Sequence, residues 1–178
     1  MTQIALIVGS LAQQSLNRAV AEHIAAQAPA GVSVETVVIG DLPLYTQDRD
    51  ADTVPAYERV RAQIKAADAV LIVSPEHNRA MPAAVKNLID IASRPAGQSV
   101  WTGKKAAIVT ASPGAYGGIN AGLQIRLSLQ SLGADVLLAP EVFLSRANTA
   151  LENGEVTDER TAGFLNKFAA AFYGWAAA

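Results

Sequence analysis

Cysteine is absent from this sequence. Without a thiol in 178 residues, the chain has no disulfide framework, no thiolate metal site and no cysteine nucleophile. Histidine is almost as rare, because His23 and His77 are the only two, and neither has an obvious catalytic partner. The motif G-x-S-x-G is also missing, which disfavours a hydrolase with a nucleophile elbow. So few potential ligands disfavour metal catalysis too, and we expect no metal site.

Charge and long apolar runs are scarce as well. Charged residues make up 17% of the chain, the formal net charge is −2, and Lys and Arg never form a run. Neutralising the phosphates of a nucleic acid needs clustered cations, so we expect no nucleic-acid partner. No stretch reaches roughly 18 uninterrupted apolar residues, and residues 1–9 lack the basic start of a signal peptide. We therefore expect a cytoplasmic protein without a membrane span.

What the sequence has is a regular alternation of strand-like and helix-like segments. Five apolar runs predict strands, at residues 4–8, 32–39, 69–74, 105–111 and 134–138. Apolar residues with helical spacing follow each run. This alternation predicts one domain over residues 1–178, an α/β fold with a doubly wound, five-stranded parallel sheet and helices on both faces. Right-handed crossovers would place the loops after the first, third and fourth strands at one edge.

Three of the predicted helices carry a further expectation. The helix predicted after Pro82 has an apolar arc that is wider than packing against one sheet face requires, so we expect it also to form a subunit interface. The arc comprises Val85, Leu88, Ile89, Ile91 and Ala92. Asn120 is the expected cap of the fourth helix. The last helix should begin near residues 157–159, and its aromatic stripe is expected to be core; the stripe comprises Phe164, Phe168, Phe172 and Trp175.

The first loop, residues 9–17, joins a strand to a helix. It offers Ser10, Ser15 and Asn17 together with the free N–H groups of a helix start, which favours a phosphate site. An ordinary capped turn explains the same residues equally well. Neither a Walker motif nor G-x-G-x-x-G is present. Asp41 could imitate the ribose-binding acid of a dinucleotide fold, but without those glycines a turn residue is the better interpretation.

The second and third loops are also unusual. The second loop, residues 74–81, is polar; Pro75 near its start and Pro82 directly after it restrict the backbone at both ends. The third loop, Ser112-Pro-Gly-Ala-Tyr-Gly-Gly118, holds three Gly and one Pro in seven residues, so backbone can approach a flat ligand. Both predicted loops follow strands of an α/β sheet, where such folds bind ligands.

In these three loops the chain resembles the NAD(P)H-dependent FMN reductase family, a flavodoxin-like group that includes quinone, chromate and azo-dye reductases. Gly9-Ser10 with Ser15-Leu16-Asn17-Arg18 is similar to G-S-x-R…S-x-N-R. Pro75-Glu76-His77-Asn78-Arg79 with Lys86-Asn87 and Asp90 is similar to P-E-Y-N…K-N-x-x-D, which is the most specific match. The third loop agrees in position and composition. The resemblance spans residues 4 to about 145 and implies the strand order 2-1-3-4-5 of a flavodoxin-like sheet.

The resemblance implies an FMN cofactor with NADPH or NADH as co-substrate. The phosphate would be held by Ser10, Ser15, Leu16 and Asn17. The isoalloxazine ring would lie along Pro75, Glu76, His77, Asn78 and Arg79, with Ser112, Gly114, Tyr116 and Gly117 on its other side. Because a flavin carries the chemistry, no catalytic side chain is assigned. Arg79 could instead contact a phosphate of the nicotinamide nucleotide, or be a solvated loop charge.

Three positions depart from the family pattern. Ala12 replaces the usual Arg of the first loop, and losing that charge-assisted contact should weaken FMN binding by about ten- to a hundredfold. His77 replaces Tyr, and either stacks on the ring or faces solvent. Ala83 replaces a Gly at a helix start, which a helix tolerates.

The resemblance implies an enzyme that passes hydride from NAD(P)H to FMN and then reduces a quinone, free flavin or similar small acceptor. The alternative is a flavodoxin-type electron carrier without nicotinamide turnover, although such carriers usually have a strongly acidic surface and this chain is nearly neutral. A homodimer or homotetramer is expected. The sequence leaves open the physiological acceptor and the choice between NADH and NADPH.

Overall fold

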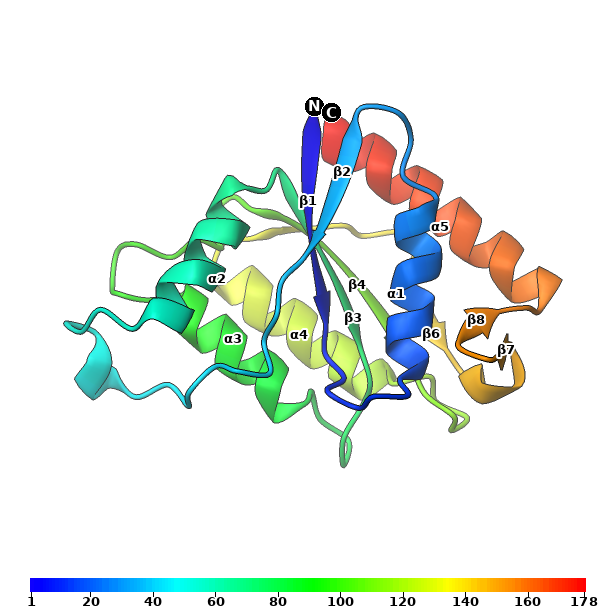
Figure 1. Ribbon diagram of the computed structural model, residues 1–178, viewed down its shortest axis with the longest axis horizontal. Helices are drawn as coiled ribbons and strands as arrows, with labels where there is room; N and C mark the ends of the chain where they lie inside the picture. The colour runs from blue at the N-terminus through cyan, green and yellow to red at the C-terminus, as the bar shows by residue number, and fades with distance from the viewer.

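The computed structural model describes residues 1–178 and contains a six-stranded parallel sheet between two layers of helices (Figure 1). The strands of this sheet are β1 (Thr2–Val8), β2 (Val32–Thr36), β3 (Ala69–Ser74), β4 (Lys105–Ala111), β5 (Asp135–Val136) and β6 (Val142–Leu144). Their order is β2-β1-β3-β4-β5, and β6 also pairs with β4. The sheet is therefore flavodoxin-like, as predicted.

The helices are α1 (Leu16–Ala26), α2 (Pro55–Ala66), α3 (Ala83–Ala92), α4 (Ile119–Ser131) and α5 (Glu159–Ala177). Two 3-10 turns, η1 (Gln47–Arg49) and η2 (Ala147–Thr149), and a small hairpin of β7 (Leu151–Glu152) and β8 (Glu155–Val156) complete the chain. Figure 1 shows α2, α3 and α4 on one side of the sheet and α1 and α5 on the other. Each layer buries its own apolar cluster against the sheet.

The fifth strand differs from its prediction. The expected strand over residues 134–138 is broken into β5 and β6, both parallel to β4. Between them the chain leaves the sheet at Leu138, whose side chain is exposed, and passes Pro140, which has no N–H to donate to a ladder. The expected loop over residues 140–155 in fact holds β6, η2 and the β7–β8 turn.

The second strand is shorter than predicted, because β2 ends at Thr36. Residues 40–54, which lack periodicity, form a long connection that is tied to α3. The side chain of Asn87 accepts a hydrogen bond from the Tyr45 N–H at 2.8 Å and donates one to the Pro43 carbonyl at 3.0 Å. Asn87 of the K-N-x-x-D motif therefore has a structural role, and Lys86 and Asp90 pair with each other at 2.6 Å.

The expectation that the apolar arc of α3 forms a subunit interface is wrong. All five residues of that arc are buried within the chain. α2 covers one flank, where Arg61 Nε donates to the Ile91 carbonyl at 3.0 Å, and the buried Trp101 covers another, where its Nε1 donates to the Ile89 carbonyl at 3.0 Å. The exposed apolar helix face is instead on α4, where Leu123 and Leu127 are 48% and 69% exposed.

In α5, Asp158 is the N-cap and accepts a hydrogen bond from the Thr161 N–H at 2.7 Å. Phe168 and Phe172 are buried and stacked with their ring centroids 6.0 Å apart, which confirms the core prediction for these two. Phe164 is 40% exposed, and Trp175 lies at the edge beside the Lys105 ammonium.

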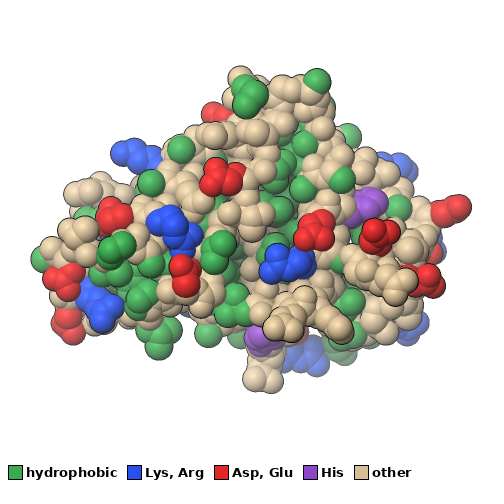
Figure 2. All heavy atoms as spheres, viewed as in Figure 1, with side chains coloured by type: hydrophobic (Ala, Val, Ile, Leu, Met, Phe, Trp, Pro, Cys, Tyr) green, Lys and Arg blue, Asp and Glu red, His purple; other side chains and the backbone are tan.

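No helix is long and apolar enough to cross a membrane. On the face in Figure 2, Lys and Arg side chains are interspersed with Asp and Glu, without a large patch of one sign.

Candidate functional site

The first, second and third loops follow β1, β3 and β4, which are neighbours in the parallel sheet. They therefore meet at one edge, at the bottom of Figure 1. Gly9 brings the first two loops into contact: its N–H donates to the Val73 carbonyl at 2.8 Å. A Cβ at Gly9 would lie 2.7 Å from both Ser74 Oγ and a methyl of Val85, so only glycine permits this approach.

The first loop presents unpaired backbone donors. Ser15 caps α1, since its Oγ accepts a hydrogen bond from the Arg18 N–H at 3.2 Å. The N–H groups of Leu16 and Asn17 have no partner in the chain, as expected for the first turn of a helix. Ser10 Oγ receives only a long 3.4 Å contact from the Ala12 N–H. These groups converge at the positive end of a helix dipole and are suited to an anion.

The side chain of Asn17 has another use. It is buried, its Nδ2 donates to the Ala111 carbonyl at 3.1 Å, and its Oδ1 accepts from the Ala111 N–H at 3.2 Å. This reciprocal pair ties the start of α1 to the end of β4. Only the backbone of Asn17 remains available to a ligand. No local sequence pattern indicates this contact, because it joins positions 94 residues apart.

The second loop is a tight hairpin. The N–H of His77 donates to the Ala80 carbonyl at 2.9 Å, and the N–H of Ala80 donates to the His77 carbonyl at 3.0 Å. Between them Asn78 and Arg79 have φ values of 50° and 67°, the pattern of a type I′ turn. Positive φ at a residue other than glycine costs of order 1–3 kcal/mol. The asparagine of a two-residue turn was the only sequence signal for this hairpin.

Glu76 fixes the base of the hairpin to α4. Its Oε2 accepts hydrogen bonds from the N–H groups of Asn120 at 2.8 Å and Ala121 at 3.1 Å. The carboxylate thus caps the first turn of α4 and complements its dipole. Asn120 was the predicted cap; it lies inside the helix instead, and its Nδ2 donates to Glu76 Oε1 at 3.3 Å.

Gln124 fixes the other side of the hairpin. Its Oε1 accepts from the Met81 N–H at 3.1 Å, and its Nε2 donates to the Arg79 carbonyl at 3.2 Å. With Glu76 it holds both ends of the second loop against α4. The hairpin is therefore a rigid part of the site.

The third loop is packed against β6. Gly117 has a φ of 61°, and a Cβ there would come within 2.6 Å of the Phe143 carbonyl carbon. Thr110 Oγ1 donates to the Gly117 carbonyl at 2.7 Å. Gly114 is different, because a Cβ there would meet only Ser112 Oγ at 3.4 Å. Gly117 is thus required by packing inside the chain, whereas Gly114 has free space beside it.

The second and third loops carry exposed side chains. His77, Asn78, Arg79 and Tyr116 are all exposed. The Arg79 guanidinium lies over the Tyr116 ring, 4.7 Å from its centroid, and so joins the two loops. Among the residues predicted to lie along the flavin ring, Glu76 and Gly117 make contacts inside the chain that hold the two loops in place. His77, Asn78, Arg79 and Tyr116 face solvent.

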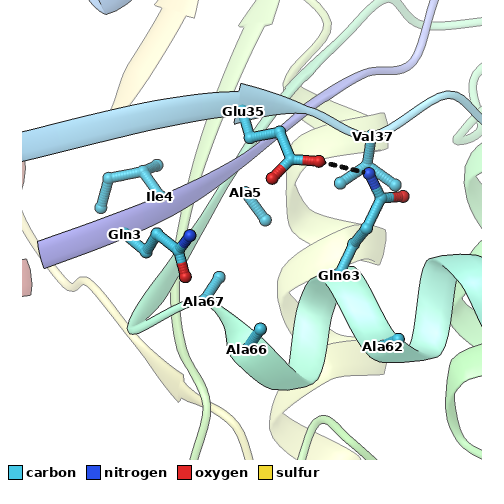
Figure 3. Close-up of a pocket in the computed structure, with 9 residues that line it drawn as sticks. All are labelled: Gln3, Ile4, Ala5, Glu35, Val37, Ala62, Gln63, Ala66 and Ala67. Carbon is cyan, nitrogen blue, oxygen red and sulfur yellow. Dashed lines mark hydrogen bonds between the residues drawn. The ribbon is translucent and has the colours of Figure 1, made fainter.

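A separate cavity of about 220 Å³ lies between α2 and the first strands, away from the three loops (Figure 3). It opens because α2 presents Ala62 and Ala66 toward the sheet, and the 2.7 Å hydrogen bond from Gln63 to Glu35 borders it. Six of its nine lining residues are hydrophobic, and Glu35 and Gln63 are paired with each other, so it is a small packing gap that offers few free polar groups to a ligand.

Comparison with solved structures places the fold among flavodoxin-like proteins. A flavodoxin from Pseudomonas aeruginosa superimposes with a TM-score of 0.61 at 19% identity, over 96% of this chain and 99% of that one. The NADPH-dependent FMN reductase family matches residues 2–149. The chain belongs to this family.

Its relatives are similar over nearly their whole length. A quinone reductase of Pseudomonas putida is 42% identical over 173 residues, covering 97% of this chain and 93% of the relative. A 2-hydroxy-1,4-benzoquinone reductase of a Burkholderia species is 40% identical, covering 97% and 95%. The structure of FerB, a flavoenzyme NAD(P)H:(acceptor) oxidoreductase from Paracoccus denitrificans, superimposes with a TM-score of 0.91 at 37% identity, over 99% of this chain and 97% of FerB.

Proposed function

We propose that this chain is an FMN-dependent quinone reductase: NAD(P)H, a proton and a quinone give NAD(P)⁺ and the hydroquinone. One observation carries the proposal. The three loops at the carboxyl edge combine unpaired N–H groups at the start of α1 with exposed polar and aromatic side chains on the second and third loops. FMN, when bound, supplies a ring that takes up and releases two electrons, so the protein needs no acid, base or nucleophile of its own.

The first loop is suited to the FMN phosphate. Its donors are the N–H groups of Leu16 and Asn17 and the hydroxyl of Ser10, and Ser15 shapes the helix start. The only contact to Ser10 Oγ within the chain is long, so this hydroxyl is free to rotate toward a ligand. This arrangement fits a phosphate but lacks the charge that an Arg at position 12 would supply.

The second and third loops are suited to the flavin ring. Pro75, His77, Asn78 and Arg79 form one side, and Ser112, Gly114 and Tyr116 the other. Glu76 and Gly117 hold these loops in place from within the chain. The hydrogen bonds from Glu76 and Gln124 hold the hairpin in place before any ligand arrives, which lowers the cost of ordering on binding.

The test is a titration of the purified chain with FMN, followed by oxidation of NADPH and NADH with and without a benzoquinone. We expect FMN-dependent oxidation of at least one nucleotide, with the quinone consumed in a one-to-one ratio. If the FMN-loaded chain consumes neither nucleotide in the presence of the quinone, the proposed function is wrong.

We also propose that residues 1–178 form a single cytoplasmic domain that assembles as a homodimer, or as a homotetramer built from such dimers. The outer face of α4 supports the assembly. It carries the exposed Leu123 and Leu127, and the one charged residue of α4, Arg126, is largely buried beside Glu141. A second copy can therefore face it without like-charge repulsion.

Light scattering tests the assembly. We expect Leu127→Lys to dissociate the protein and Leu138→Lys, an equally exposed site between β5 and β6, to leave the mass unchanged. A monomeric wild-type chain would exclude the α4 contact.

A further inference from the structure

Arg79 is a cation whose position is fixed but whose hydrogen-bond donors are unused. Its guanidinium makes no hydrogen bond within the chain; the nearest carboxylate oxygen, Glu76 Oε1, lies 3.9 Å away. Glu76 already accepts hydrogen bonds from the start of α4. The Arg79 side chain is 64% exposed and stacks on Tyr116. An arginine in this state offers a planar fork of N–H groups to an incoming anion.

The backbone conformation of Arg79 also suggests a functional role. It occupies the second central position of a type I′ turn, where glycine is the residue of lowest strain. The paired hydrogen bonds of His77 and Ala80, with the clamp of Gln124 on the Arg79 carbonyl, hold this strained conformation. Strain retained in such a well-fixed turn is typical of functional positions. Packing gives no reason for an arginine here, because the side chain is mostly outside the core.

We propose that Arg79 binds a phosphate of the nicotinamide nucleotide and thereby sets the preference of this enzyme for nucleotide hydride donors over uncharged ones. The inference rests on the proposed function. A reductant must reach the flavin ring that we place at the second and third loops, and the exposed Arg79 lies there, stacked on Tyr116 of the third loop. Both NADH and NADPH carry a pyrophosphate, and NADPH adds a 2′-phosphate. An unsubstituted quinone has no anionic group for a guanidinium to pair with.

The main variant is Arg79→Gly, which removes the guanidinium and relieves the backbone at the same position. It is compared with Arg79→Lys and with the control Arg160→Gln, an exposed arginine in the first turn of α5. The donors are NADPH, NADH and N-benzyl dihydronicotinamide, which has no phosphate. We expect Arg79→Gly to lower kcat/KM for NADPH about tenfold relative to the benzyl donor, mainly through KM. Arg79→Lys should restore part of this loss, and Arg160→Gln should leave the ratio as in the wild type.

Two measurements that do not depend on turnover complete the test. The dissociation constant of NADP⁺ for the FMN-loaded protein, from calorimetry, should rise about tenfold in Arg79→Gly. The melting temperature of the FMN-free variant should be equal to or above that of the wild type, since glycine suits the turn. A fall in NADPH use alone identifies the 2′-phosphate, and a fall in use of both nucleotides identifies the pyrophosphate.

An unchanged donor ratio together with an unchanged NADP⁺ affinity would overturn the role of Arg79 while leaving the proposed function intact. Conversely, if the wild type oxidises no nucleotide, the reductase proposal fails. The NADP⁺ titration of wild type and Arg79→Gly still decides whether Arg79 binds phosphate.

Discussion

The two ends of the candidate site use their polar groups differently. At the second and third loops, the side chains of Glu76, of Thr110 in β4 and of Gln124 in α4 make hydrogen bonds within the protein. In the first loop the N–H groups of Leu16 and Asn17 have no partner. The chain itself thus satisfies the polar groups at the second and third loops, whereas at the first loop it leaves N–H donors free for the anion that we propose. Changes at the second and third loops should alter the stability of the FMN-free protein, and changes at the first loop should alter FMN affinity.

Gly117→Ala should have the largest effect. A Cβ at this position clashes with the Phe143 backbone and must adopt a positive φ, so we expect the free energy of unfolding of the FMN-free protein to fall by about 3 kcal/mol. Urea denaturation measures this. The control is Gly154→Ala in the β7–β8 turn, which has positive φ but nothing within 4 Å. Equal losses in the two variants would show that the contact with Phe143 contributes nothing.

Ala12→Arg tests the opposite end. A guanidinium beside the phosphate should tighten FMN binding by about 1.5 to 3 kcal/mol, or roughly ten- to a hundredfold, with a steeper salt dependence. The stability of the FMN-free protein should stay within about 0.5 kcal/mol, because the residue is exposed. Flavin fluorescence quenching measures the affinity, and Ala12→Gln controls for side-chain size. Unchanged affinity would mean that position 12 does not face the phosphate.

Glu76→Ala should remove the cap of α4. We expect the FMN-free protein to lose about 1 to 2 kcal/mol of stability, because the N–H groups of Asn120 and Ala121 lose their acceptor. Chemical denaturation tests this against Glu152→Ala, an exposed glutamate in β7. If stability holds and only FMN affinity falls, Glu76 contacts the ligand directly, and the two ends are less different than we infer.

The last prediction concerns the α1–α5 layer, has no effect near neutral pH and should not depend on FMN. Burial raises the pKa of Tyr173 to about 12 from an ordinary value of 10.0, and its hydroxyl donates to the Ile24 carbonyl at 2.9 Å. The unfolded tyrosine ionises first, so this contribution is complete below pH 10 and is lost as the pH rises toward 12. Denaturation between these pH values should show a shallower decline for Tyr173→Phe. Identical slopes would contradict a raised pKa.

Much of the fold followed from local sequence. The apolar runs located β1, β3 and β4 because a strand buried on both faces needs a continuous apolar segment. The broken fifth strand was missed, since residues 134–138 are apolar enough for a strand and only the exposed excursion at Leu138 interrupts it. The width of the α3 arc was misinterpreted for a similar reason: its extra residues contact α2 and Trp101, which lie elsewhere in the sequence.

The sequence by itself determined where the three loops lie and which family they resemble, because strand runs, turn residues and loop motifs are written in consecutive positions. Only the tertiary structure decided which of their residues hold the loops in place and which remain free for a ligand. Glu76 caps a helix that begins 43 positions later, and Asn17 binds a strand 94 residues away, as the sheet order brings them together. Such contacts depend on which strands are neighbours, and no local pattern encodes them. The same assembly leaves the N–H groups of Leu16 and Asn17, and those of the Arg79 guanidinium, without hydrogen-bond partners, and these define the candidate site.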